Sequence, residues 1–165
     1  MIRFLRGFVY AGKGVIACIL GERNMRFHLC AAFYVLLLMP FYGFSRGEKL
    51  AVFIVIGAVI SAEAFNTAVE ALTNLVSPEQ NVLAGLAKDA AAGGVLVSAA
   101  AAAAVGVTLY FDRAVMGDIL SYFGGHSLAL TAFILSVIAW IGFICAPLKK
   151  KTGAHRETKN ENNDH

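Results

Sequence analysis

Residues 50–76 read LAVFIVIGAVISAEAFNTAVEALTNLV, an apolar stretch that nevertheless carries two carboxylates, Glu63 and Glu70. About 20 apolar residues are enough to cross the roughly 30 Å of hydrocarbon in a bilayer. This stretch is longer, so we predict a transmembrane helix whose carboxylate-bearing half projects beyond the bilayer. Because the residue before a proline is disfavoured in the α conformation, Pro78 is predicted to end the helix near Val76.

Three further apolar stretches are candidate membrane spans: residues 29–44, 90–111 and 127–147. The chain of 165 residues is 58% hydrophobic, and its mean hydropathy is +0.68. Soluble domains are closer to half apolar and a quarter charged, so the composition indicates a membrane protein. The stretch 90–111 is rich in Ala and Gly, a composition that favours close helix packing in membranes.

The segment from Phe4 to Leu20 has the periodicity of a helix that lies on a membrane surface. Its apolar residues recur at helical spacing, and Arg3, Arg6 and Lys13 fall on the opposite face. We therefore predict an all-α polytopic membrane helical bundle with an N-terminal amphipathic surface helix, three core transmembrane helices and an extra fourth. Residues 1–111 form the membrane domain, 112–148 the extra helix, and 149–165 a basic, disordered tail.

The distribution of charge predicts the orientation of the chain. Residues 1–28 carry five basic groups against one acid, and residues 148–165 carry five more. Lys and Arg in short loops prefer the cytoplasmic side, so both termini are predicted to be cytoplasmic. The two loops at the other side, around residues 45–49 and 112–126, are nearly neutral. The net charge of +3 is thus an orientation signal, and nothing indicates nucleic-acid binding.

The polar residues of the long span lie on one stripe. Glu63, Asn66 and Glu70 have the spacing i, i+3 and i+7, and Glu63 and Glu70 differ in height by roughly 10 Å along a helix. Carboxylates within a membrane segment are costly, which makes them functional candidates. Such a stripe suits phosphoryl transfer to a lipid alcohol, with Glu70 placed for a metal ion and Glu63 for the acceptor hydroxyl.

Residues from other segments could complete this chemistry. Glu22 would join the metal site if the helices pack together. Lys88 can pair with phosphate, and Asp89 can orient Lys88 or bind ribose or metal. Their predicted position at the start of a helix would add backbone N–H donors for an anion. The alternatives are a solvated Glu70 near a helix end, an ordinary interfacial Lys88–Asp89 pair, and membrane-anchoring roles for the basic residues of 23–26.

Three blocks of sequence together resemble the prokaryotic diacylglycerol kinase family. They are ERNMRFH at 22–28, AEAFNTAVE at 62–70 and AKDAAAG at 87–93, and the resemblance extends over residues 3–110. The first block is closer to the Gram-positive branch, whose members prefer undecaprenol. Asn74 departs from the usual Asp of the family and Asn81 from a common His, while the fourth span and the tail lie outside the minimal family unit.

The resemblance implies an ATP-dependent lipid kinase of the bacterial inner membrane that phosphorylates undecaprenol, to undecaprenyl phosphate, or diacylglycerol, to phosphatidate. It implies a homotrimer with active sites shared between subunits. Glu63 would be the general base, Asn66 would support the acceptor site, and Glu22 and Glu70 would hold Mg²⁺. The residues implied in nucleotide binding are Arg3, Tyr10, Glu79, Gln80, Asn81, Lys88 and Asp89.

The sequence is also compatible with two other functional hypotheses. A small proton-coupled transporter also fits four spans with an intramembrane carboxylate, although it has no need of a second carboxylate near the cytosolic face. An inactive scaffold descended from the kinase is disfavoured, because every proposed metal and base position keeps its carboxylate.

Overall fold

The computed structural model describes residues 2–77 and 81–148. Within these ranges all the secondary structure is helical, as the sequence predicts. The elements are α1 (Ile2–Gly21), α2 (Arg23–Leu38), the 3₁₀ turn η1 (Met39–Tyr42), α3 (Arg46–Val76), α4 (Val82–Tyr110), α5 (Arg113–Gly125) and α6 (Ser127–Cys145). The predicted tail, 149–165, lies outside the described residues.

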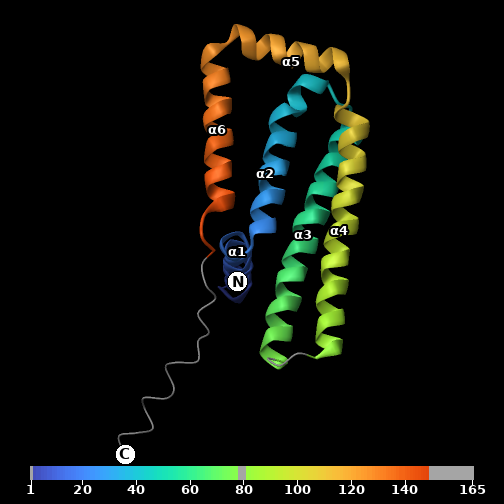
Figure 1. Ribbon diagram of the computed structural model, residues 1–165, viewed down its shortest axis with the longest axis vertical. Coiled ribbons are helices and arrows are strands. Elements are labelled where there is room, and N and C mark those ends of the chain that lie inside the picture. The colour runs from blue at the N-terminus through green and yellow to red at the C-terminus, as the bar shows by residue number, and fades with distance from the viewer. Residues whose placement is uncertain (1, 78–80, 149–165) are drawn as a thin grey trace, which may run out of the picture.

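Four long helices, α2, α3, α4 and α6, run alongside one another (Figure 1). Helix α1 is seen nearly end-on in the same view, so it runs crosswise to them at one end of the bundle, and α5 lies across the opposite end. Five described helices, α1 included, are long and apolar enough to cross a membrane. The crosswise direction of α1, with Phe4, Phe8 and Ile16 exposed, agrees with the predicted surface helix.

Single residues set the boundaries near the two ends of α2. Glu22 has an extended backbone, with φ −123° and ψ 126°, and separates α1 from α2. Pro40 lies in η1, and Gly43 follows with φ 58°, a left-handed conformation that favours glycine. Ser45 and Glu48 then form a capping box at the start of α3, because each side chain accepts a hydrogen bond from the other residue's backbone N–H.

Helix α4 begins earlier than the sequence suggested. Asn81 is its N-cap, and the amide oxygen of Asn81 accepts a hydrogen bond of 2.8 Å from the backbone N–H of Leu83. Lys88 and Asp89 therefore lie inside the helix, where each backbone N–H is bonded to the carbonyl four residues earlier. The prediction that these residues offer free backbone donors to an anion is wrong for this reason.

The connection between α4 and α6 is also more ordered than a loop. Asp112 caps the N-terminus of α5 by accepting a 2.8 Å hydrogen bond from the backbone N–H of Ala114. At this α5 end of the bundle an aromatic cluster joins η1, the η1–α3 turn and α4. The Tyr42 hydroxyl donates to the Tyr110 carbonyl and the Tyr110 hydroxyl to the Val35 carbonyl, both at 2.9 Å, while the Phe44 and Tyr110 ring centroids are 5.0 Å apart.

Candidate functional site

The polar stripe of α3 is buried among the helices. Glu63 is 1% exposed, Asn66 8% and Thr67 7%, whereas Phe65 on the opposite face is 73% exposed. A carboxylate with so little exposure in an apolar bundle is expensive unless something compensates for its charge. The burial therefore separates Glu63 from the merely solvated acid that the sequence left as an alternative for Glu70.

The length of α3 places its carboxylates at different depths. Depth along the helix can be counted from Lys49, which is exposed near its start. At about 1.5 Å per residue, Glu63 lies about 21 Å along the helix from Lys49 and Glu70 about 31 Å from it. If a hydrocarbon layer of about 30 Å begins near Lys49, Glu70 falls at the far interface and Glu63 about 10 Å inside it.

Two buried oxygen atoms on this stripe lack a partner. Glu63 Oε2 and Asn66 Oδ1 are buried and make no hydrogen bond within the described ranges. The Asn66 Nδ2 group is 3.5 Å from Glu70 Oε1, at the outer limit of a hydrogen bond, and Thr67 Oγ1 donates to the Glu63 carbonyl at 3.0 Å. Because unpaired buried acceptors cost free energy, this pair of oxygens fits a site that receives a hydroxyl proton or a cation.

Three acidic side chains from two segments of the chain, Glu22 at the α1–α2 junction and Glu63 and Glu70 of α3, interact electrostatically. The carboxylates of Glu22 and Glu70 are both close enough to Glu63 to act on it. Glu22 comes from the α1–α2 junction, so three separated positions of the chain contribute negative charge here. Among residues 2–77 and 81–148, no three acidic, His or Cys side chains are close enough together to hold a metal on their own.

That finding still leaves room for magnesium. Mg²⁺ is commonly held by one or two carboxylates together with substrate phosphates and water, rather than by a cage of protein ligands. Glu22 and Glu70, both half-buried, could supply the two carboxylates. The Asn66 Oδ1 atom, which has no hydrogen-bond partner among the described residues, could add a neutral oxygen ligand. The oxygen-only character of the set fits a hard divalent cation.

The other predicted nucleotide residues are dispersed in the structure. Lys88 Nζ donates to Asn74 Oδ1 at 2.7 Å and links α4 to α3, so the Asn at position 74 keeps a hydrogen bond to this lysine without a charge. Asn81 is used as a helix cap. Asp89 is exposed, as is Tyr10, whose ring centroid lies 5.9 Å from Lys13 Nζ. Arg3 lies in the first turn of α1, and Glu79 and Gln80 fall outside the described residues.

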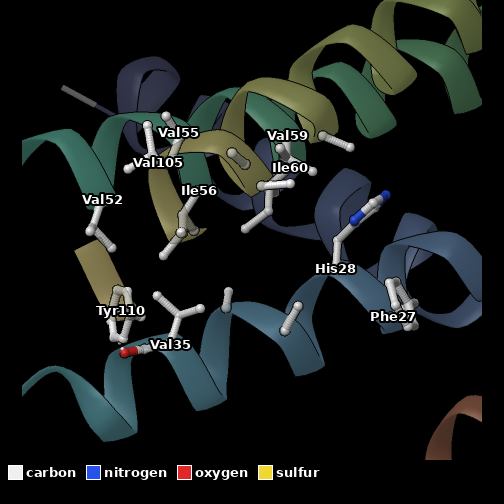
Figure 2. Close-up of a pocket in the computed structure, with 16 residues that line it drawn as sticks. Phe27, His28, Val35, Val52, Val55, Ile56, Val59, Ile60, Val105 and Tyr110 are labelled. Carbon is white, nitrogen blue, oxygen red and sulfur yellow. Dashed lines mark hydrogen bonds between the residues drawn. The ribbon is translucent and has the colours of Figure 1, made fainter. Parts of the chain in front are cut away.

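An apolar groove of about 320 Å³ runs between α2, α3 and α4 and ends beside the polar stripe. Figure 2 shows Val52, Ile56 and Val59 of α3 facing Val35 of α2 across it. The side chains that α4 contributes to the groove are mostly small and leave the space open. They are Ala99, Ala102, Ala103 and Gly106. Tyr110 lines the α5 end, while the opposite end reaches His28 and Ile60, so the groove stops one helical turn from Glu63.

Sequence reasoning missed the role of Arg26, which it treated as a membrane anchor. The side chain is only 3% exposed and hydrogen-bonds to backbone carbonyls near the C-terminal ends of α1 and α6. A signal was present in the sequence, because Arg26 follows the helix break at Glu22 and lies between Met25 and Phe27. The acceptors from α6 could not have been found from sequence, since they lie more than a hundred residues away.

Comparisons with known proteins identify relatives of this chain. The sequence model of a family described as prokaryotic diacylglycerol kinase matches residues 9–110. A curated relative, undecaprenol kinase from Bacillus subtilis (strain 168), is 37% identical over 111 residues, which is 67% of this chain and 90% of the relative. No solved structure matches the chain. The family match covers most of α1 and all of α2 to α4, ends at Tyr110, and gives no support to a transporter.

Proposed function

The chain belongs to the prokaryotic diacylglycerol kinase family and is a multi-pass bacterial membrane lipid kinase, and we propose that it transfers the γ-phosphate of ATP to undecaprenol with the help of Mg²⁺. The observation that carries the proposal is the buried Oε2 atom of Glu63, which has no hydrogen-bond partner among the described residues and lies one helical turn beyond the end of an apolar groove. The name of the Bacillus subtilis relative favours a polyprenol over diacylglycerol as the acceptor.

The groove binds the isoprenoid chain of the acceptor, and the polar stripe binds its terminal hydroxyl. A water-sized group occupies about 30 Å³, so 320 Å³ holds on the order of ten carbon atoms, or the first two isoprene units. Bilayer lipid is as apolar as the groove, so the groove orients the chain more than it adds affinity. It directs the terminal hydroxyl toward Glu63, whose Oε2 accepts the proton as the hydroxyl oxygen bonds to the γ-phosphorus of ATP and the bond from that phosphorus to the departing ADP breaks. The Asn66 oxygen is the second acceptor beside it.

The phosphates are held at the interface end of α3. Glu22 and Glu70 would hold Mg²⁺, which when bound neutralises charge on the phosphate oxygens. Lys88 donates to a phosphate oxygen in exchange for its hydrogen bond to Asn74. Arg3, Tyr10, Glu79, Gln80, Asn81 and Asp89 complete the nucleotide site. The depth difference between Glu70 and Glu63 keeps the nucleotide in the aqueous interface while the acceptor hydroxyl is still among apolar side chains.

The assembly we propose is a homotrimer with cytoplasmic termini and shared sites. Small residues are the preferred contacts between membrane helices, and several on α4 are exposed in the single chain, among them Ala90, Ala92, Gly94, Ala100 and Ala104. Within residues 2–77 and 81–148 no three side chains form a metal site by themselves, which is also consistent with a contribution from a neighbouring subunit. The basic charge of the N-terminal segment supports a cytoplasmic α1 end.

The test is a direct assay of both acceptors. The purified full-length protein, in vesicles with γ-labelled ATP and Mg²⁺, is given undecaprenol or diacylglycerol, and labelled lipid is measured. We expect undecaprenyl phosphate at the higher kcat/KM, and loss of product with EDTA. Product from diacylglycerol alone would overturn the acceptor assignment, and no product from either lipid would overturn the proposed transfer.

A further inference from the structure

Arg26 joins the ends of two helices that are distant in sequence. Its Nε donates to the Ile19 carbonyl and its Nη2 to the Leu20 carbonyl, both at 2.8 Å, at the C-terminal end of α1. Its Nη1 donates to the Phe143 and Ala146 carbonyls, both at 2.9 Å, at the C-terminal end of α6. The guanidinium also lies 5.0 Å from the centroid of the Phe143 ring.

The physical chemistry of helix ends explains why an arginine is suited to this position. The last four carbonyls of a helix have no partner within it, and the helix dipole adds about half a negative charge there. Two such ends converge on a side chain that is 3% exposed, where little water is available to solvate them. A guanidinium remains charged and offers five N–H donors in a fixed plane, whereas the three N–H donors of a lysine all come from one nitrogen and cannot span carbonyls of two helix ends as well.

Further contacts hold α6 in position for this junction. The Tyr34 hydroxyl and Ser136 Oγ are 3.0 Å apart, which joins the middle of α2 to α6. The Phe33 and Trp140 rings lie 5.8 Å apart and the Tyr34 and Phe133 rings 5.5 Å apart. Helix α6 is therefore packed along α2 on this chain, and its end is carried to Arg26 by side-chain contacts over several turns.

The same junction contains a proposed metal ligand. Glu22 lies directly between the end of α1 and the start of α2, and its backbone N–H donates to the Cys18 carbonyl at 2.9 Å. The direction of its side chain depends on how the end of α1 is held against α2. Arg26, one turn into α2, holds that end through Ile19 and Leu20 and is itself held by α6.

We propose that α6, the second of two helices that follow the family-matched region, is an intramolecular support that fixes the α1–α2 junction through Arg26 and thereby positions Glu22 for the metal. The inference rests on the proposed function only for the role of Glu22. Arg26 is a positioning residue in this scheme, because it acts through Glu22 and does not touch the reacting groups.

The structural half of the proposal is tested by cross-linking in the full-length chain. Cys18 precedes Ile19 and Cys145 precedes Ala146, so a short bis-maleimide should link the two cysteines within one chain of a Cys30→Ser background. Peptide mass spectrometry of the monomer band reports the link. We expect Arg26→Lys and Trp140→Ala to reduce its yield several-fold, and the exposed Arg23→Lys control to leave it unchanged.

The functional half is tested by the Mg²⁺ dependence of kinase activity. Changes in groups that orient metal ligands commonly cost about 10-fold to 100-fold in metal affinity. We expect Arg26→Lys and Trp140→Ala to raise the apparent KM for Mg²⁺ by about 10-fold, with the KM for undecaprenol unchanged. A simple membrane anchor would accept lysine in place of arginine without loss.

The outcomes separate the two proposals. Unchanged cross-linking in Arg26→Lys and Trp140→Ala would overturn the support by α6, whether or not the enzyme proves to be an undecaprenol kinase. Reduced cross-linking with an unchanged Mg²⁺ dependence would overturn the positioning of Glu22. Failure of the wild-type protein to phosphorylate either lipid would count against the proposed function alone, since cross-linking does not depend on turnover.

Discussion

The substitution Glu63→Gln tests the assignment of the general base most directly. Glutamine has nearly the same volume and keeps the side-chain carbonyl oxygen, but it cannot take up a proton at neutral pH. Glu63 is buried, and the carboxylates of Glu22 and Glu70 act on it electrostatically. Replacing its charge with a neutral amide removes repulsion and desolvation cost, so we expect the variant to fold at least as stably as the wild type.

The magnitude follows from the burial of the side chain. General base catalysis contributes about 10²-fold to 10⁴-fold. A base in an open site can be replaced in part by water, whereas Glu63 is 1% exposed and its Oε2 has no partner among the described residues. We therefore expect the upper part of the range, a fall in kcat of about 10³-fold to 10⁴-fold, or about 4–5 kcal/mol of transition-state free energy.

The assay is steady-state kinetics in undecaprenol-containing vesicles with Mg-ATP, alongside thermal unfolding of the same preparations. Thr67→Val is the matched control, because Thr67 lies on the same buried face but its hydroxyl only donates to the Glu63 carbonyl of its own helix. We expect kcat for this control to stay within about threefold of the wild type. A Glu63→Gln enzyme that keeps more than a tenth of the wild-type kcat would refute the role of Glu63 as the base.

Three further predictions concern metal, acceptor and assembly. Glu70→Gln should raise the apparent KM for Mg²⁺ by at least about 10-fold in an Mg²⁺ titration, and an unchanged value would remove Glu70 from the metal site. Ala102→Leu overfills the groove, so the KM for undecaprenol should rise by about 5-fold to 100-fold while exposed Val97→Leu changes little; equal effects would contradict a tail in the groove. Glu63→Gln and Asp89→Asn subunits, mixed equally, should recover about a quarter of wild-type activity if sites are shared, and no recovery in mixed trimers would argue against sharing.

The long helices and the polar stripe were within reach of sequence reasoning, because hydropathy and helical periodicity are local properties. The spacing of Glu63, Asn66 and Glu70 was enough to put them on one face, and the structure buries the first two. Element boundaries were less accessible. The start of α4 was misjudged because the cap formed by Asn81 precedes the apolar run, and α5 was missed because its 13 residues are too short and mixed to resemble a span.

The features that the sequence did not predict depend on contacts between segments that are distant in the chain. The hydrogen bond between Lys88 and Asn74 depends on the relative height of two antiparallel helices, which sequence periodicity does not determine. The Ala- and Gly-rich composition of residues 90–111 predicted close packing, and α4 does pack closely against α3. Composition did not predict the groove, which forms where small α4 residues face branched ones on α3 and α2. The bonds from Arg26 to α6 connect residues separated by 117 and 120 positions, beyond any local pattern.

The electrostatic repulsion among Glu22, Glu63 and Glu70 explains why the contacts of Arg26 matter for the site. Bringing Glu22 and Glu70 toward a buried Glu63 is unfavourable in the bare protein, because like charges repel one another where little water screens them. A chain free to relax would swing the α1–α2 junction away from α3, because the extended residue at position 22 is the natural hinge. Fastening the end of α1 through a buried arginine opposes that relaxation before any cation arrives. The free energy needed to hold the three carboxylates together is then supplied during folding. The binding of metal and nucleotide therefore does not have to supply it.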